Sequence, residues 1–260
     1  HKQAGFTIIE VMLYLGVAAM LFLIAFWGTE GQVNQFRYSD AARNLNSYIQ
    51  EQYNSVQSGT NPREATETCT ATGAQPPSFG TGSPNPTGGN ADECILLGKL
   101  VQFTPGSSTV NVYYVVGYNA PFTSLTGDDL TDIKNSQPTI SPIDATTTNI
   151  SGGLTFYQPG SVPPSGLSES FAFLRSPSSS NILTFAFNNV DINNGNLSPG
   201  ASYTIPPAVI GNSLDTNDAG YCLYFGAVPE KYSMIQLGNN TQGGSINISY
   251  NPNPNTQCVQ

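Results

Sequence analysis

The chain has 260 residues, of which 8 are Lys or Arg and 17 are Asp or Glu, so its formal net charge at pH 7 is −9. This acidic balance argues against nucleic acid as the main partner, because recognition of phosphates needs clustered basic side chains. Charged residues make up 10% of the chain and apolar residues 38%, whereas Gly (26) and Pro (19) are abundant. Ordinary globular domains are roughly 45–50% apolar with Gly included in that count, so this composition favours a secreted, β-rich surface protein.

Histidine and cysteine limit the chemistry further. The single histidine, His1, argues against a Ser/His/Asp or Cys/His catalytic centre and against a His-rich zinc site. We therefore expect a protein that is not an enzyme and holds neither a cofactor nor a metal. Cys69, Cys94, Cys222 and Cys258 lack CxxC spacing and predict disulfides in an oxidising compartment. Of the three connectivities, we favour Cys69 with Cys94 and Cys222 with Cys258, because each pair is nearest in sequence.

The N-terminal segment predicts a membrane helix. Residues 6–27 are FTIIEVMLYLGVAAMLFLIAFW, and no charged residue follows Glu10 in this run. As a helix, these residues span roughly 33 Å, which matches a bilayer core of about 30 Å. A cleavable secretory signal has a shorter apolar run followed by a small-residue cleavage site. We therefore expect an anchor rather than a signal that is removed after this run.

The apolar pattern continues through residues 28–57 at three- and four-residue steps, which is the period of an amphipathic helix. Its members are Val33, Phe36, Ala41, Ala42, Leu45, Tyr48, Ile49, Tyr53 and Val56. The sequence predicts one long helix from residue 6 to residue 57, with this second half packed on a further layer. Gly28 and Gly31 each cost about 1 kcal/mol in a helix, so we expect a bend or unwinding at residues 28–31.

The remainder, residues 58–260, predicts a β-rich head. Residues 58–90 are rich in Gly, Pro, Ser and Thr and are typical of an irregular surface loop. Short β-branched and aromatic runs then predict strands at residues 95–103, 109–117, 154–157, 170–174, 182–187, 203–205, 221–225, 232–237 and 245–250. We expect a hairpin from residues 170–187 and a meander from the last three strands. The fold class is α+β, with the long helix packed against an antiparallel sheet.

Glu10 is the anomaly of the apolar run. An acidic side chain at the bilayer centre costs roughly 2.5–3.5 kcal/mol on insertion scales. On position alone, a functional intramembrane carboxylate and a side chain that merely reaches the headgroups are equally good explanations. The segment GFTIIEVML at residues 5–13, however, resembles the processing site and mature start of type IV pilins and pseudopilins.

This resemblance implies a specific set of events at the N-terminus. A prepilin peptidase cuts between Gly5 and Phe6 and methylates the new amine of Phe6, while residues 1–5 are a leader remnant or an N-terminal extension. Glu10 then pairs with the terminal amine of a neighbouring subunit. In an apolar bundle such a pair neutralises two charges, and removing one partner of a buried pair costs about 3–5 kcal/mol.

The resemblance also implies the biological role. We expect a structural subunit of a type IV pilus, held in the cytoplasmic membrane before assembly and located in an extracellular filament afterwards, that supports adhesion or twitching motility. Its partners would be copies of itself or other pilins, the prepilin peptidase, the membrane assembly machinery and a receptor on a host surface. The alternatives are a pseudopilin of a type II secretion or competence machine and a membrane-anchored adhesin that does not polymerise.

Two acidic segments of the head are weaker signals. Asp215, Asn217 and Asp218 are calcium candidates, because closely spaced oxygen ligands suit a hard cation. No EF-hand loop surrounds them, so a helix cap or an Asx turn is the stronger expectation. The segment GDDLTD at residues 127–132 predicts a solvated loop or the start of a helix.

Overall fold

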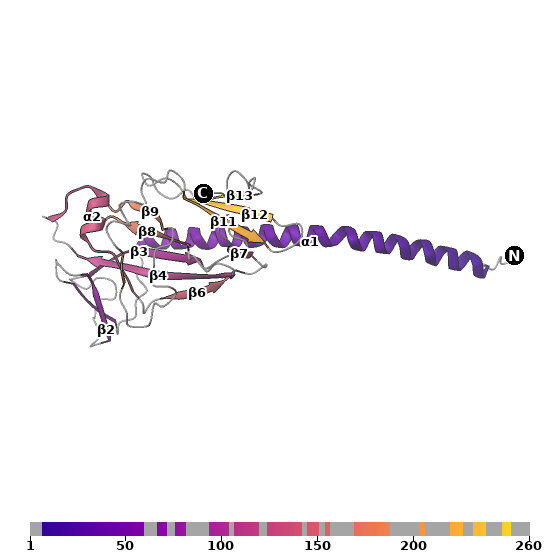
Figure 1. Cartoon of the computed structure of the whole chain (residues 1–260), viewed down its shortest axis with the longest axis horizontal. Helices are drawn as coiled ribbons and strands as arrows, with labels where there is room; N and C mark the ends of the chain where they lie inside the picture. Colours follow the sequence, from indigo (N-terminus) through magenta and orange to yellow (C-terminus); the bar gives the residue numbers. More distant parts are fainter. Residues whose placement is uncertain are drawn as a thin grey trace.

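The computed structural model describes residues 7–59, 67–71, 76–81, 94–103, 107–119, 124–141, 145–150, 154–156, 169–187, 203–205, 219–225, 231–237 and 246–250. Helix α1 (Ile8–Ser58) dominates the molecule: its first half projects away from the head as a lone rod, and its second half lies inside the head (Figure 1). Thr7 caps its start, and Gly59 ends it in the left-handed conformation at φ 65°, where its N–H bonds to the Val56 carbonyl.

Helix α1 is helical through residues 28–31, so the unwinding expected at Gly28 and Gly31 is wrong. A glycine costs only about 1 kcal/mol within a helix. Helix formation is cooperative, and a break here would also require two new, uncapped ends in the middle of the rod. Two isolated glycines are therefore insufficient to interrupt the helix.

The described strands form three sheets, all with antiparallel pairing. One has two strands in the order β1-β2, one has seven in the order β10-β5-β4-β3-β8-β9 with β6 added along β4, and one has four in the order β13-β12-β11-β7. The strands are β1 (Glu67–Thr70), β2 (Ser78–Thr81), β3 (Cys94–Phe103), β4 (Thr109–Tyr118), β5 (Thr139–Ile140), β6 (Thr146–Asn149), β7 (Leu154–Phe156), β8 (Glu169–Arg175), β9 (Ile182–Phe187), β10 (Tyr203–Thr204), β11 (Ala219–Phe225), β12 (Lys231–Leu237) and β13 (Ile246–Tyr250).

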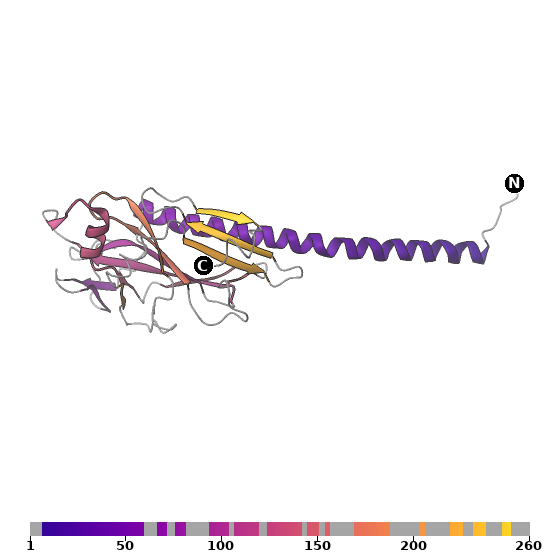
Figure 2. The ribbon, with the colours of Figure 1, turned by 45° about the horizontal axis from the view of Figure 1, so that its top comes forward.

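The predicted α+β class is confirmed, and each of the nine predicted strands has a counterpart within two residues at either end. The hairpin β8-β9 and the meander β11-β12-β13 are confirmed as well. Two expectations are corrected. Residues 58–90 contain the hairpin β1-β2 and so are not wholly irregular. Helix α1 meets two sheets rather than one, since it contacts β3 and β8 of the larger sheet and β7 and β13 of the smaller sheet (Figure 2).

The seven-stranded sheet is covered on both faces. Side chains alternate along its strands, so neighbouring residues enter different cores. Between one face of this sheet and α1 lies one core. It is formed by Tyr38, Ala41, Leu45, Ile49, Tyr53 and Val56 of the helix and by Val101, Phe103, Val110, Val112, Phe171 and Phe173 of the strands. The opposite face is covered by helix α2 (Asp129–Asn135), whose Ile133 packs with Leu100, Val115, Leu174 and Phe185.

A bulge in β3 tightens this sheet. The pairing of β3 with β4 shifts register between Leu96 and Gly98. A Cβ at position 98 would lie 1.8 Å from the carbonyl oxygen of Phe173 on β8, so only glycine allows this approach.

Candidate functional site

The outer half of α1 is the most unusual surface of the described chain. Residues Ile8–Ala25 are long and apolar enough to cross a membrane, and none of them is buried within the chain. The large apolar side chains exposed here are Ile8, Ile9, Val11, Met12, Leu13, Tyr14, Leu15, Val17, Met20, Leu21, Phe22, Leu23 and Ile24. A contiguous apolar surface of this size requires lipid or another protein to cover it.

The first turn of this rod explains part of the TIIE sequence. Thr7 is extended and caps the helix, with its Oγ1 accepting a hydrogen bond from the backbone N–H of Glu10 at 3.4 Å. A Thr followed three residues later by Glu is the capping-box pattern. Glu10 also places a negative charge at the positive end of the helix dipole, which stabilises a helix by roughly 0.3–1 kcal/mol. Glu10 therefore has a local structural role.

This local role gives the carboxylate of Glu10 no cation among the residues of α1 that the structure describes. Its side chain is exposed, and the first basic residue after it, Arg37, lies 27 positions along the chain or roughly 40 Å along the rod. Within residues 7–59 the chain therefore offers it no salt-bridge partner, although it stands in an apolar stretch where an unpaired charge is costly. Gly5 and Phe6, the residues expected at the cleavage site, lie outside the described residues.

A second polar feature joins α1 to the sheet. Lys99 of β3 is only 6% exposed. Its Nζ donates a 2.8 Å hydrogen bond to Oε1 of the buried Gln52 on α1, and the same Nζ lies 5.0 Å from the ring centre of Tyr114. Burial lowers the pKa of Lys99, and the nearby carboxylate of Glu51 offsets part of that shift. This contact lies in the face that the sequence pattern assigned to apolar packing, and no local signal in the sequence pairs the two residues.

The acidic segment at residues 127–132 has an exposed start and a buried end. Asp128 caps α2 by accepting from the Thr131 N–H, which confirms the expected helix start. Asp132, however, is fully buried and accepts hydrogen bonds from the N–H groups of Thr126 and Gly127 at 2.7 and 3.1 Å. The expectation of a solvated segment is wrong for Asp132, because the preceding loop folds back over its carboxylate.

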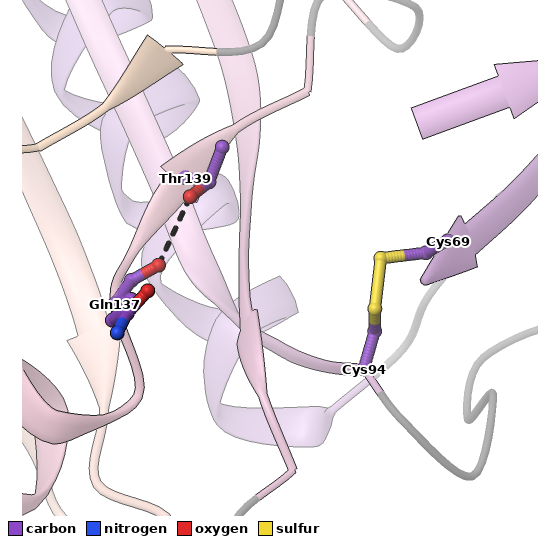
Figure 3. Close-up of a disulfide and its surroundings, with 4 residues drawn as sticks. All are labelled: Cys69, Cys94, Gln137 and Thr139. Carbon is purple, nitrogen blue, oxygen red and sulfur yellow. Dashed lines mark hydrogen bonds between the residues drawn. A yellow bond between two sulfur atoms is a disulfide. The ribbon is translucent and has the colours of Figure 1, made fainter. Parts of the chain in front are cut away.

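Cys69 and Cys94 form a disulfide that ties β1 to the start of β3, which is the pairing favoured on sequence distance (Figure 3). Both residues are buried with Ala71 and Val116 in a small cluster of their own. The same close-up includes the turn after α2, where Thr139 Oγ1 donates to the Gln137 carbonyl at 3.0 Å. The disulfide therefore fixes the satellite hairpin β1-β2 to the main sheet.

Several expected site residues cannot be placed. Cys222 lies in β11, but Cys258 is outside the described residues, so their pairing stays a prediction. The calcium candidates Asp215, Asn217 and Asp218 also lie outside the described residues. Among the residues that the structure describes, no group of three or more His, Cys, Asp or Glu side chains is arranged to hold a metal ion.

Comparison with known proteins finds a match to one motif, in the N-terminal segment of the chain. Residues 1–26 match the family model of the prokaryotic N-terminal methylation motif, which is the class III prepilin signal of type IV pilins. No curated protein and no solved structure matches the chain. The motif indicates a protein of the type IV pilin-like or pseudopilin type, and the apolar helix followed by an antiparallel sheet is consistent with a pilin-like fold. This class implies processing by a prepilin peptidase and assembly with other pilins.

Proposed function

We propose that this chain is a structural subunit of a type IV pilus filament and that it assembles through the outer half of α1. The observation that carries the proposal is the apolar rod Ile8–Ala25, none of it buried within the chain, with the carboxylate of Glu10 near its start and no basic residue within residues 7–36 to pair with it. Lipid covers such a rod before assembly. In the filament, copies of the same rod cover one another, and the heads lie outside them.

Glu10 makes assembly selective. Its carboxylate pairs with the terminal amine of a neighbouring copy, which is the amine of Phe6 if the chain is cut after Gly5 as proposed. The low dielectric of the apolar bundle strengthens this attraction, whereas a copy that docks out of register leaves two buried charges unpaired. The pair therefore sets the position of each new subunit along the filament axis.

The head suits an exposed coat. Its chain is stapled by the Cys69–Cys94 disulfide, and the whole protein carries few charged residues. We propose that the assembled filament supports adhesion or twitching motility. A pseudopilin would use the same helix but form a short structure that stays in the cell envelope, so the location and length of the assembled material separate the two roles.

The direct test is Glu10→Gln, which keeps the size and the polar character of the side chain but removes its charge. We expect the chain to remain in the membrane, while the amount in filaments sheared from the cell surface falls at least about tenfold, as the loss of one partner of a buried pair implies. Glu51→Gln is the matched control, because Glu51 is an exposed glutamate on the same helix within the head. Normal filaments in the Glu10→Gln variant would contradict the proposal and favour a simple anchor.

Cellular assays on the same two variants test the biological role. Surface attachment and the spreading zone of twitching cells are measured beside the sheared fraction. If filaments are lost and neither assay changes, the proposal that the chain assembles into filaments stands. The proposed role in adhesion and motility is then contradicted. Material that reaches only the cell envelope in the unmodified strain would identify the pseudopilin alternative.

A further inference from the structure

One face of the seven-stranded sheet carries a row of uncharged polar side chains, which we call the amide row. It crosses four strands, and its members, each the register partner of the next, are Ser170 of β8, Gln102 of β3, Asn111 of β4 and Thr147 of β6. Leu100 and Tyr113 lie two positions from Gln102 and Asn111 and belong to the core beneath α2. Because side chains alternate between the faces of a sheet, the amide row lies on the face away from α1. Its open end is at β6, beside β4 on the lower side of the head in Figure 1.

The two carboxamides of the amide row have their oxygens occupied and their nitrogens unused. The hydroxyl of Tyr113 donates to Oε1 of Gln102 at 3.3 Å, and Oγ1 of Thr147 donates to Oδ1 of Asn111 at 2.9 Å. Neither amide nitrogen makes a hydrogen bond within the part of the chain that the structure describes. Each of these nitrogens carries two N–H donors. The amide row therefore offers donors that have no acceptor.

The burial of the amide row makes these unused donors significant. Gln102 is only 5% exposed, whereas Thr147 at the open end is exposed. An apolar side chain would fill the position of Gln102 without leaving an unpaired donor, as Leu100 does two residues earlier on the same face. A ligand that brings acceptor oxygens accounts for a carboxamide at this place.

The same arrangement recurs beside the amide row, nearer the edge of the sheet. Thr109 and Asn149 are register partners on β4 and β6, and Oγ1 of Thr109 donates to Oδ1 of Asn149 at 3.0 Å. The amide nitrogen of Asn149 again makes no hydrogen bond among the described residues. In all three carboxamides a hydroxyl of the protein occupies the oxygen and leaves the nitrogen for an outside partner.

We propose that the amide row binds a neutral polysaccharide, whose hydroxyl and ring oxygens accept hydrogen bonds from the amide nitrogens of Gln102 and Asn111. None of its four side chains is charged, and the net charge of −9 on the whole chain disfavours an anionic ligand. Three strand spacings separate Ser170 from Thr147, or roughly 14 Å, which leaves room for a short stretch of sugar units. An extended peptide would instead pair its backbone with the edge of a strand.

The biological use of this site rests on the proposed function. With the helices inside the filament and the heads outside, the sheet face away from α1 is turned outward. The amide row then gives the proposed adhesion a class of ligand. Binding itself does not require assembly, so it can be measured on the full chain in detergent and, separately, on sheared filaments.

Retention on immobilised polysaccharides tests the proposal. The beads carry mannan, galactan or β-glucan as neutral probes, dextran sulfate as the anionic probe and gelatin as the peptide probe, and bare beads give the background. We expect retention on at least one neutral polysaccharide, release by its free oligosaccharide, and little change with salt. Asn111→Asp keeps the oxygen that Thr147 contacts but replaces the donor by an acceptor, so retention should weaken by at least about tenfold. Asn54→Asp is the matched control, because it adds the same charge at an exposed asparagine of α1.

Thr147→Val is a second variant, which keeps the β-branched shape on an exposed strand but removes the hydroxyl that orients Asn111. We expect about threefold weaker retention and an unchanged circular dichroism spectrum. Absence of retention on every neutral polysaccharide would overturn the proposal, as would retention on dextran sulfate or gelatin alone, or equal retention of Asn111→Asp and the parent. If the chain binds but forms no filaments, only the proposed function fails. If filaments form but do not bind, only the polysaccharide site fails.

Discussion

The contact between Gln52 and Lys99 provides the sharpest test of how α1 is held to the head. We predict that Gln52→Leu destabilises the chain much more than Lys99→Met does. Gln52 is 8% exposed and Lys99 is 6% exposed, and their 2.8 Å hydrogen bond crosses from the helix to the central strand. Replacing Gln52 leaves a buried ammonium without its hydrogen-bond acceptor, with the ring of Tyr114 and the carboxylate of Glu51 nearby.

The magnitude follows from which partner is removed. A hydrogen bond to a charged group contributes about 1.5–3 kcal/mol, and the remaining buried cation adds its own cost of desolvation. We therefore expect Gln52→Leu to lower the free energy of unfolding by about 2–3 kcal/mol, or about 4–12 °C in Tm for a domain of this size. Lys99→Met removes the charge and keeps the length of the side chain, so its effect should stay within about 1 kcal/mol.

The pH dependence of the free energy of unfolding shows whether the buried charge of Lys99 lowers stability. Because burial lowers the pKa of Lys99 below its ordinary 10.5, the folded state loses this proton before the unfolded state does. The cost of burying the charge is complete below the folded pKa and disappears as pH rises from that value toward 10.5. The stability of the unmodified chain should therefore rise relative to that of Lys99→Met over this window.

The measurement is urea unfolding of the detergent-solubilised chain, followed by circular dichroism, for both single variants and for the double variant. We expect the double variant to recover most of the loss, with a coupling free energy of at least about 1.5 kcal/mol. Equal losses in Gln52→Leu and Lys99→Met, with additive effects in the double variant, would refute the view that Gln52 is there to satisfy a buried cation.

Two further predictions concern the head. Burial by itself raises the pKa of Asp132, but hydrogen bonds from Thr126 and Gly127 hold it below 3.8. The stabilisation from this carboxylate should therefore be complete above pH 3.8 and be lost as pH falls through the pKa of the folded state. Asp132→Asn should reduce this loss of stability in acid, measured by urea titrations at pH 2–6. The Cys69–Cys94 disulfide closes a sequence separation of 25 residues, so its loss should cost about 3–4 kcal/mol, measured as the difference in urea midpoint between the oxidised parent chain and a Cys69→Ser, Cys94→Ser variant, and reductant should abolish that difference.

Sequence patterns predicted the longer elements well, because their signal is local. The strand expected at residues 182–187 is β9 with the same bounds, and the runs around Leu100 and Val112 are rich in β-branched and aromatic residues. Strands β5 and β6 escaped prediction, because each is short and β6 consists of Thr and Asn alone. Such segments become strands only when β4 presents an edge for pairing, which is a tertiary effect.

The candidate site divides in the same way. The N-terminal motif and the apolar run are contiguous, so Glu10 could be singled out from the sequence. The contact of Lys99 with Gln52 joins residues 47 positions apart, and a lysine within a strand carries no mark of burial. The apolar pattern grouped Phe36 with Leu45, but the two residues are nine positions apart, which is about 180° around a helix, so Phe36 lies on the opposite face and is exposed while Leu45 is buried.

The shared use of α1 by the rod and the head determines how a pilus would bear tension. A pull applied to the head reaches the base of the subunit through the side-by-side packing of residues 38–56 on the sheet, with no linker in between. Force along this direction loads many contacts in parallel as shear, rather than peeling them apart one after another. Stretching such a fibre would therefore load the whole interface between the helix and the head of each subunit at once.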